Sequence, residues 1–384
     1  MPDFEDPTLF PVIHRHHWLN HAAISAWPAP VIAAAQEFVR DNQQHGALHY
    51  EDWMAREDAL REQLANFLDA ASPDDISLVR NTSEALNIIA TGLTWSPGDE
   101  VIFPANEFPS NLLPWKALEA QGVVAKSIEL SHTHPEQDII AQITPDTRLV
   151  AVSAVQFDTG VRLDLDAIGQ AAHQVGALFC VDAIQMLGAL PLSTERSPVD
   201  FVVSGSHKWL MAPEGMGFMW SRRSVREQMH VALPGWRMYA DPFNFNRTDW
   251  NPPMTGRRFE TGTVNMFGIH GLSAAIDLLM KLGPEQTAHA LLDRTDHIVT
   301  TLSKAPEIEL LTPTERSRRA GIVCFRVHGT DAECMVNELA NKQIFVAKRG
   351  HNIRVSPHFY TPFDQIDAFL ESVQDAQLLT TCAA

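Results

Sequence analysis

Short apolar runs alternate with helical patterns between about residue 28 and residue 221. The runs have the length of buried strands and end at turn-forming residues. They cover residues 76–80, 100–104, 148–155, 177–182, 200–205 and 215–221. Because strands and helices alternate along the chain, we expect an α/β fold in which helices pack on both faces of a mostly parallel sheet.

Beyond this region the pattern changes. Residues 234–258 are irregular and rich in proline and aromatic residues, which predicts an excursion over the surface or over a neighbouring subunit. A long helix is expected at residues 268–282. An earlier helix, at residues 55–67, carries charges between its apolar positions and is expected to be exposed.

The last hundred residues predict a second, smaller domain. Two helical patterns and the alternating strand 321–327 follow residue 284, which indicates an α+β unit. We therefore expect a large domain over residues 15–283 and a small domain over residues 284–384, to which residues 1–14 also belong.

Composition narrows the classes of function. The chain has 384 residues, of which 45% are apolar, enough for a large core. Its formal charge of −18 repels nucleic-acid phosphates and anionic membranes, so neither partner is expected. No apolar stretch reaches 18 residues, and the N-terminus lacks the apolar run of a signal peptide. These features predict a cytoplasmic protein that acts on small molecules.

Cysteine and histidine positions do not form a metal-binding pattern. The four cysteines, Cys180, Cys324, Cys334 and Cys382, are scattered and form no CxxC pair. This scatter favours a reducing compartment over a disulfide framework or a zinc site. The histidines at positions 14, 16 and 17 have no neighbouring acid or cysteine, and those at 132 and 134 lie in a polar loop, so no metal is expected.

The stretch FVVSGSHKWL, residues 201–210, runs from a strand into a small polar turn that presents Lys208. A lysine amine forms a Schiff base readily when burial or nearby positive charge lowers its pKa. A lysine after a strand is more often a solvated loop residue. Lys208 is therefore a candidate catalytic residue whose interpretation depends on its neighbours.

A second candidate is Asp182, which ends the strand 177–182 at the carboxyl edge of the predicted sheet. Open α/β folds bind ligands at this edge. A buried carboxylate there stabilises the protonated pyridinium nitrogen that pyridoxal 5'-phosphate (PLP) needs to act as an electron sink. The alternative is that Asp182 only caps a helix. Beside a Schiff-base lysine, it favours PLP as the cofactor.

The phosphate of PLP requires hydrogen-bond donors. The turn RNTSEAL, residues 80–86, places hydroxyls and free backbone N–H groups at the start of a predicted helix, where a dianion binds well. Thr82 and Ser83 are the candidates there, although such residues also cap helices for structural reasons alone. Ser206 and His207, just before Lys208, and Thr263 are further candidate donors.

Six blocks in order resemble the class V aminotransferase family: TSEALN, EFPSNLLPW, VDAIQ, SGSHKWL, RFETGTVN and IRVSPHFYTP. That family includes cysteine desulfurases, selenocysteine lyases, isopenicillin N epimerase and, more distantly, kynureninase. The resemblance extends from WLNHAA at residues 18–23 to about residue 367. It implies a fold type I homodimer with a seven-stranded sheet, PLP near the subunit interface and an amino-acid substrate.

The resemblance also implies roles for cofactor-binding residues. Lys208 would form the Schiff base, Asp182 would contact the pyridine nitrogen, and Gln185 would lie near the ring 3-oxygen. The residues that would surround the phosphate are Thr82, Ser83, Ser206 and His207. Thr263 would reach the phosphate of the neighbouring subunit, so that each active site would depend on dimerisation.

For the substrate, the resemblance implies that Arg354 clamps the α-carboxylate and so fixes which Cα bond stands perpendicular to the PLP ring. A surface ion pair is the alternative for this arginine. Asn20 and His21 are expected to line the entrance, and Arg349 lies just upstream of Arg354.

Two departures from the family shape the functional prediction. Desulfurase-like members stack a histidine on the cofactor ring, where this chain has Phe108. Phe108 is expected to stack there and offers no proton, so acid–base steps fall to Lys208, unless Phe108 is an ordinary core residue. Residues 344–353 also lack the cysteine that persulfide-forming desulfurases keep on a mobile loop, and Cys324 and Cys334 look structural.

The sequence therefore predicts a PLP enzyme with carbon–sulfur lyase or epimerase-like chemistry and without a persulfide cysteine. An aminotransferase and a kynureninase-like hydrolase are alternatives, because all of these reactions follow from one carbanion at Cα. A non-catalytic binding protein on the same scaffold would be expected to lose Lys208 or Asp182, and both are present. A nicotinamide dehydrogenase is disfavoured, since no GxGxxG follows a strand.

Overall fold

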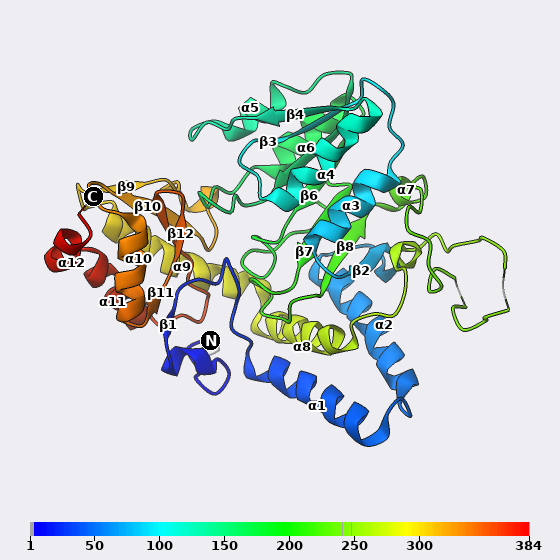
Figure 1. Cartoon of the computed structure of the whole chain (residues 1–384), viewed down its shortest axis with the longest axis horizontal. Helices are drawn as coiled ribbons and strands as arrows, with labels where there is room; N and C mark the ends of the chain where they lie inside the picture. The colour runs from blue at the N-terminus through cyan, green and yellow to red at the C-terminus, as the bar shows by residue number, and fades with distance from the viewer. Residues whose placement is uncertain (1–3, 240, 247, 384) are drawn as a thin grey trace.

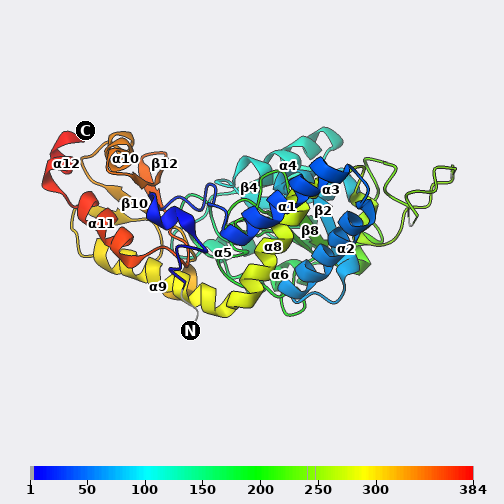
Figure 2. The same cartoon turned by 90° about the horizontal axis from the view of Figure 1, so that it is seen from below.

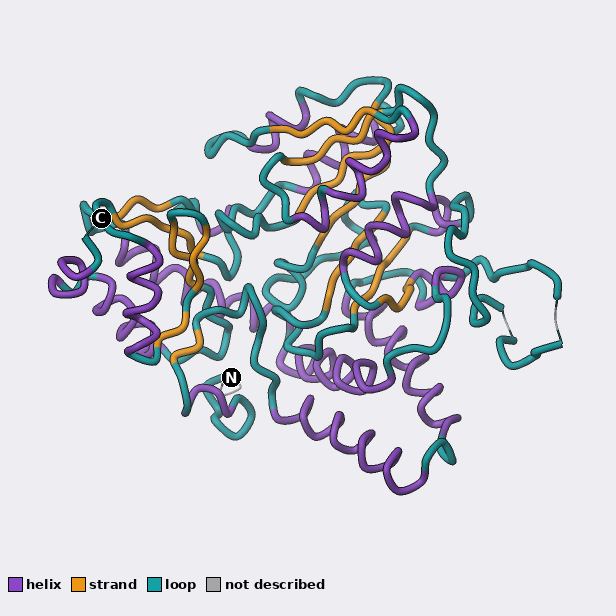
Figure 3. The backbone as a smooth tube through the Cα atoms, viewed as in Figure 1, coloured by secondary structure: helices purple, strands orange, loops and turns teal. Residues whose placement is uncertain are grey.

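The computed structural model describes residues 4–239, 241–246 and 248–383. Figure 1 shows a large domain that holds the central sheet and, at the left, a small domain coloured mostly yellow to red. The strands of the two domains form separate sheets, as the tube view makes plain (Figure 3).

The large domain is built on a seven-stranded sheet with the order β2-β8-β7-β6-β5-β3-β4. Its strands are β2 (Ile76–Val79), β3 (Glu100–Pro104), β4 (Val124–Ile128), β5 (Thr147–Ser153), β6 (Leu178–Asp182), β7 (Phe201–Gly205) and β8 (Gly217–Ser221). Strand β8 runs antiparallel to β2 and β7 on its two sides, and the other neighbouring strands of this sheet are parallel to each other. The predicted α/β fold with a mostly parallel sheet is confirmed.

One strand of this sheet, β4, was not among the runs expected from the sequence. It lies at the edge of the sheet, and each of its residues is exposed or half-buried. An edge strand buries less apolar surface than a central one, so its sequence carries a weaker signal.

Helices cover both faces of the sheet and give the large domain two cores. On one face, α3 (Thr82–Gly92) and α4 (Leu113–Ala117) pack against alternate strand residues. On the other face lie α6 (Leu165–Gln174) and α8 (Met266–Leu282), with α1 (Ala29–His45) and α2 (Tyr50–Phe67) packed on α8. Because both faces of the central strands are buried, these strands read as continuous apolar runs.

The expectation that the helix near residues 55–67 is exposed is wrong. Helix α2 lies beside α8, and seven of its residues are buried (Figure 2). Its charged residues do not all face water, because Arg61 forms ion pairs with Glu57 at 2.6 Å and with Glu260 at 2.7 Å, and all three are buried. The charged residues in the sequence indicated an exposed helix. Their ion pairs with each other and with Glu260 allow these side chains to be buried.

The small domain is an α+β unit. Its antiparallel sheet contains β9 (Ile308–Leu310), β10 (Val323–Val327), β12 (Ala347–Arg349) and β13 (Asn352–Val355). Its helices are α9 (Pro284–Leu302), α10 (Ala332–Asn341), α11 (Phe363–Val373) and α12 (Ala376–Thr381), more than the two helical patterns expected. Strand β1 (His17–Trp18) lies within the predicted large domain, which begins at residue 15, yet it pairs with β11 (Ile344–Phe345) of the small domain. The domain limits stay predictions.

The scattered cysteines are not all free. Cys334 of α10 and Cys382, just after α12, form a disulfide, with their Cα atoms 5.5 Å apart. The C-terminal turn packs on the start of α10, where the Asp331 N–H donates to the Cys382 carbonyl. The prediction against a disulfide was therefore wrong, because a separation of 48 residues in sequence says nothing about contact in space.

Residues 234–255 contain no helix or strand among those described and project from the large domain at the right of Figures 1 and 2. This confirms that the region is irregular, although its predicted last residues, 256–258, form a 3-10 helix, and its contact with a neighbouring subunit stays a prediction. Several of its apolar side chains are exposed, among them Phe245 and Trp250.

The apolar helix α8 continues into α9 through a sharp bend. Within the described residues, no single helix is long and apolar enough to cross a membrane, and only α8 and α9 taken together, bent by 83°, have that length and composition.

Candidate active site

A cavity of about 450 Å³ opens at the carboxyl ends of β5, β6 and β7. It brings together most of the predicted site residues: Thr82, Ser83, Phe108, Asp182, Gln185, His207, Lys208 and Arg354. The parallel strands end at this one edge, so loops far apart in sequence converge there. The small domain completes the wall with residues of β12 and β13.

Lys208 follows β7 and is half-buried in the cavity wall. Burial lowers the pKa of its amine to about 8, and the nearby Arg354 and Arg349 act in the same direction, while Asp182 opposes them. A lysine with this pKa presents far more neutral, nucleophilic amine near neutral pH than an ordinary lysine does. The structure thus gives Lys208 the environment that a Schiff-base lysine requires.

Asp182 ends β6 and is buried. One of its carboxylate oxygens accepts the backbone N–H of Ile184 at 3.0 Å, and burial raises the pKa of the carboxyl to about 6. A buried acid of this kind gains from a cationic partner, and the protonated pyridinium nitrogen of PLP is such a partner.

The start of α3 presents hydroxyl groups to the cavity. Asn81 caps the helix by accepting the N–H of Glu84 at 2.9 Å. The Thr82 hydroxyl is buried and has no hydrogen-bond partner among the described residues, and Ser83 shares a hydrogen bond of 2.7 Å with Ser110. A buried hydroxyl without a partner at a helix N-terminus fits a phosphate group.

Two predicted phosphate donors lie outside this cavity. The Ser206 hydroxyl contacts the carbonyl oxygens of Pro213 at 2.6 Å and Met216 at 2.8 Å, so it fixes the turn after β7 and is not free to bind a phosphate. Thr263 lines a different hollow, next to Asn265 and Gly215. Its role at a neighbouring subunit stays a prediction.

Gln185 is held in place on the cavity wall. Its amide donates to the carbonyl of Ala22 at 3.0 Å and accepts from the indole N–H of Trp209 at 2.8 Å. A second amide N–H remains for a ligand oxygen.

Arg354 of β13 is almost fully buried, so it is not a surface ion pair. Its guanidinium donates to the carbonyl of Phe157 at 2.9 Å and approaches Asn20 at 3.5 Å. Burial lowers its pKa to about 9, and repulsion from Arg349 adds to the effect. Asn20 contacts Arg354 but does not itself line the cavity, contrary to the expectation that it lines the entrance.

The expectation that His21 lines the entrance is wrong. Its ring is fully buried, shares a hydrogen bond with Ser25 and packs edge-on against His358 at 5.1 Å. Burial holds its pKa well below the usual value, so the ring is neutral. His21 faces the interior next to Asn20, which contacts Arg354.

Phe108 lies on the cavity wall and is 46% exposed, so it is not an ordinary core residue. The Lys208 nitrogen lies 5.6 Å from the centre of its ring, and Phe157 packs edge-on against it at 5.5 Å.

Sequence reasoning missed the acid that anchors this loop. Glu107 is buried, and its carboxylate accepts the backbone N–H of Ser153 at 2.6 Å and the Ser153 hydroxyl at 2.5 Å. Burial raises its pKa to about 7, although the hydrogen bonds from Ser153 oppose the shift. The anchor ties the loop that carries Phe108 to the end of β5. The one signal in the sequence that could have pointed to Glu107 is its position directly before Phe108, the predicted ring-stacking residue.

Glu107→Gln is expected to stabilise the cofactor-free protein at pH 8 by up to about 3 kcal/mol. The unfolded carboxyl loses its proton near its ordinary pKa, whereas the folded one keeps it up to about pH 7, so ionisation weakens folding as the pH rises through this range. Glutamine can accept the Ser153 N–H through its amide oxygen and donate to the Ser153 hydroxyl through its amide nitrogen, without a charge. Denaturant unfolding at pH 5 and pH 8 measures the difference, and an equal effect at both pH values would contradict it.

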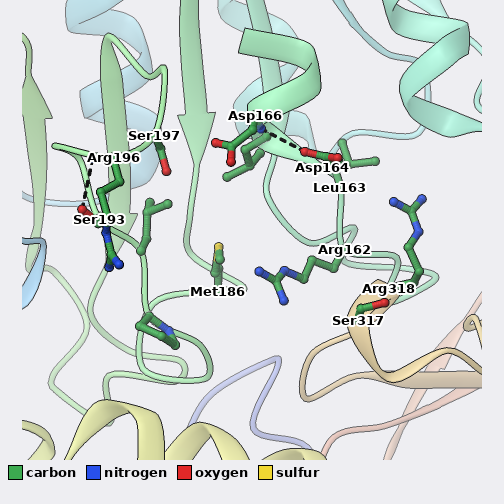
Figure 4. A pocket seen from close by; sticks show the side chains of 13 residues that line it. Arg162, Leu163, Asp164, Asp166, Met186, Ser193, Arg196, Ser197, Ser317 and Arg318 are labelled. Atoms are coloured by element: carbon green, nitrogen blue, oxygen red, sulfur yellow. Dashed lines mark hydrogen bonds between the residues drawn. The ribbon is translucent and has the colours of Figure 1, made fainter. Parts of the chain in front are cut away.

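A second cavity, of about 550 Å³, lies where the large domain meets residues 317–318 of the small domain (Figure 4). Two of its charged groups are engaged, since Arg318 binds Glu136 through two contacts of 2.6 and 3.0 Å and Asp164 caps α6. No lysine lines this cavity, so it cannot hold PLP as a Schiff base.

The family model for aminotransferase class-V matches residues 17–368 of the chain. A cysteine desulfurase from Klebsiella pneumoniae is 30% identical over 89% of this chain and 87% of that protein. A probable cysteine desulfurase from Methanothermobacter thermautotrophicus is 29% identical over 95% of this chain and 96% of its own.

Solved structures show the same fold at low identity. The cystine C–S lyase C-DES, in complex with its reaction product cysteine persulfide, is 24% identical and superposes with a TM-score of 0.89 over 96% of this chain and 99% of that one. The cysteine desulfurase CsdA from Escherichia coli is 25% identical, with a TM-score of 0.85 over 99% of this chain and 98% of that one. The seven-stranded sheet and the small domain are thus those of fold type I PLP enzymes.

Proposed function

Because the chain belongs to the class V aminotransferase family and is a PLP-dependent enzyme, we propose that it is a carbon–sulfur lyase for an α-amino acid and works without a persulfide cysteine. The observation that carries this proposal is the position of the four cysteines, none of which lines the cavity. Cys334 and Cys382 are joined in the disulfide. Cys180 and Cys324 are buried, and burial raises the pKa of the Cys324 thiol to about 12.

A persulfide relay needs an accessible thiolate, because the thiolate is the nucleophile. Neither free cysteine meets that requirement. Relatives named cysteine desulfurase and the neighbour named cystine C–S lyase act on sulfur amino acids by name, which favours a carbon–sulfur bond as the target here.

The cofactor has a fitting set of residues. Lys208 would hold its aldehyde carbon, Asp182 its ring nitrogen, and Thr82 and His207, with the N-terminus of α3, its phosphate. When bound, PLP supplies an electron sink for the electron pair released at Cα.

The residues of the chain would perform the remaining steps. Arg354 binds the α-carboxylate and so orients the Cα–H bond. With its amine free during turnover, Lys208 would take the proton from Cα. The sulfur then leaves Cβ with the bonding electron pair, and the Lys208 ammonium returns a proton to it. Phe108 offers no proton and only shapes the pocket.

The products separate elimination from desulfuration. Elimination from a cysteine derivative, followed by hydrolysis, yields pyruvate and ammonia, whereas transfer of sulfur to an enzyme cysteine leaves alanine. We expect the holoenzyme to release pyruvate from L-cystine, and Cys324→Ser to release it at an unchanged rate. Alanine as the main product, with a persulfide on Cys324 detected by mass spectrometry, would contradict the proposal.

We also propose a homodimer with shared active sites, with Thr263 serving the neighbouring subunit. Two features support this arrangement. Aromatic residues of the 234–255 excursion are exposed, and Thr263 lies outside the active-site cavity of its own subunit. The cytoplasmic location stays a prediction from sequence, and the disulfide is the one feature that counts against a reducing compartment.

A further inference from the structure

Two arginines of the small domain face the active-site cavity from one hairpin. Strands β12 and β13 are antiparallel, with Arg354 opposite Ala347 and Arg349 opposite Asn352. Residues two apart in a strand share a face, so Arg349 lies on the same face as Arg354, in the diagonal position. Both side chains line the cavity that contains Lys208.

Neither guanidinium forms an ion pair within the described part of the chain. Arg349 donates to the carbonyl of Lys348 at 2.7 Å, and Arg354 donates to the carbonyl of Phe157. The Nε atom of Arg354 is buried and has no partner among the described residues. Burial lowers the pKa of Arg349, and each arginine also lowers the pKa of Lys208. This end of the cavity therefore carries an excess of positive charge.

The nearby acids do not neutralise this charge. Asp158 interacts electrostatically with both arginines, yet its carboxylate accepts from Asn106 at 3.2 and 3.3 Å and lies beyond ion-pair distance of either. Asp182, at the end of β6, would be occupied by the cofactor ring. Glu214 also lines the cavity, where its charge raises the pKa of His207. Cations that are wholly or partly buried without an anionic partner are costly, so this end of the cavity favours a ligand with anionic groups.

We propose that the substrate is a cysteine derivative whose side chain ends in a second negatively charged group, which Arg349 binds while Arg354 binds the α-carboxylate. This rests on the proposed function. An arginine suits this role because its fork matches a carboxylate with two parallel hydrogen bonds. Two sources share the required chemistry: a simple side-chain carboxylate, or the α-carboxylate of a second amino acid joined through a disulfide, as in cystine.

The neighbouring residue offers a matched control. Lys348 lies on the opposite face of β12, is exposed and pairs with Glu333 at 2.7 Å. Lys348→Gln removes one positive charge a single residue away from Arg349 without altering the cavity wall.

The test compares ligand pairs of the same size in the holoenzyme by calorimetry. S-carboxymethyl-L-cysteine and its neutral amide, S-carboxamidomethyl-L-cysteine, differ only in the terminal charge, and L-cystine represents the second source. Wild type is expected to bind the acid at least about tenfold more tightly than the amide. Arg349→Gln should remove this preference, Lys348→Gln should keep it, and Arg354→Gln should weaken binding of both ligands.

If S-carboxymethyl-L-cysteine binds more tightly than L-cystine, the second anionic group of the substrate is a simple side-chain carboxylate. If L-cystine binds more tightly, that group is the α-carboxylate of a second amino acid. Equal binding of acid and amide by wild type, or an equal loss of both in Arg349→Gln, would overturn the inference. These outcomes leave the proposed function intact, because PLP uptake at Lys208 and pyruvate release are measured separately on the same preparations.

Discussion

Lys208→Ala is expected to lower kcat/KM by at least about 10³-fold and to remove the visible absorbance of lysine-bound PLP. The reason is that one amine both holds the cofactor and moves the Cα proton. It has the lowered pKa, about 8, that such a dual role requires. Phe108, the ring nearest to it, has no proton to offer in its place.

The control for this variant is Lys348→Gln, which changes a lysine outside the cavity. Far-UV circular dichroism should be the same for both variants and for the wild type, so that lost activity is not lost folding. Retention of a tenth or more of the activity by a folded Lys208→Ala would show that another group moves the proton.

Asp182→Asn is expected to lower kcat/KM by about 10²-fold or more, because a neutral amide does not keep the pyridinium proton in place. In the cofactor-free protein the pKa of Asp182 is raised to about 6 by burial. Only the ionised carboxylate attracts the pyridinium, so the PLP affinity of the wild type should fall as the pH drops below about 6. The variant should lack this pH dependence.

Equilibrium dialysis of PLP between pH 5 and pH 8 measures the effect, with the exposed Asp166→Asn as a variant of the same chemistry outside the site. An unchanged pH dependence in Asp182→Asn would assign the effect to a different group, of which Glu107 is the nearest in pKa.

The parts of the fold that follow from local pattern were predictable. Six strands of the large sheet were visible as apolar runs because each is buried on both faces. Edge strand β4 was not predictable, because it buries little surface. The burial of α2 was not predictable either, because it depends on partners such as Glu260 that are far away in sequence. The disulfide was missed for the same reason as the burial of α2, because it depends on a distant contact.

The same division applies to the site. Lys208, Asp182 and Thr82 stand at the ends of strands or the start of a helix, so motifs located them. His21 and Ser206 lie in similar motifs, yet their side chains turn to His358 and to backbone carbonyls, which sequence does not show. Glu107 emerged only from its contacts with Ser153, and the shared strand face of Arg349 and Arg354 only from the strand register.

The most direct test of the central claim is to reduce the purified, PLP-loaded protein with borohydride and to map the modified peptide by mass spectrometry. Reduction makes the bond between the cofactor and its lysine permanent. The pyridoxyl group is expected on the peptide that contains Lys208 and is expected to be absent from Lys208→Ala. A pyridoxyl group on another lysine, or none on the wild-type protein, would contradict the assignment of this cavity as the active site.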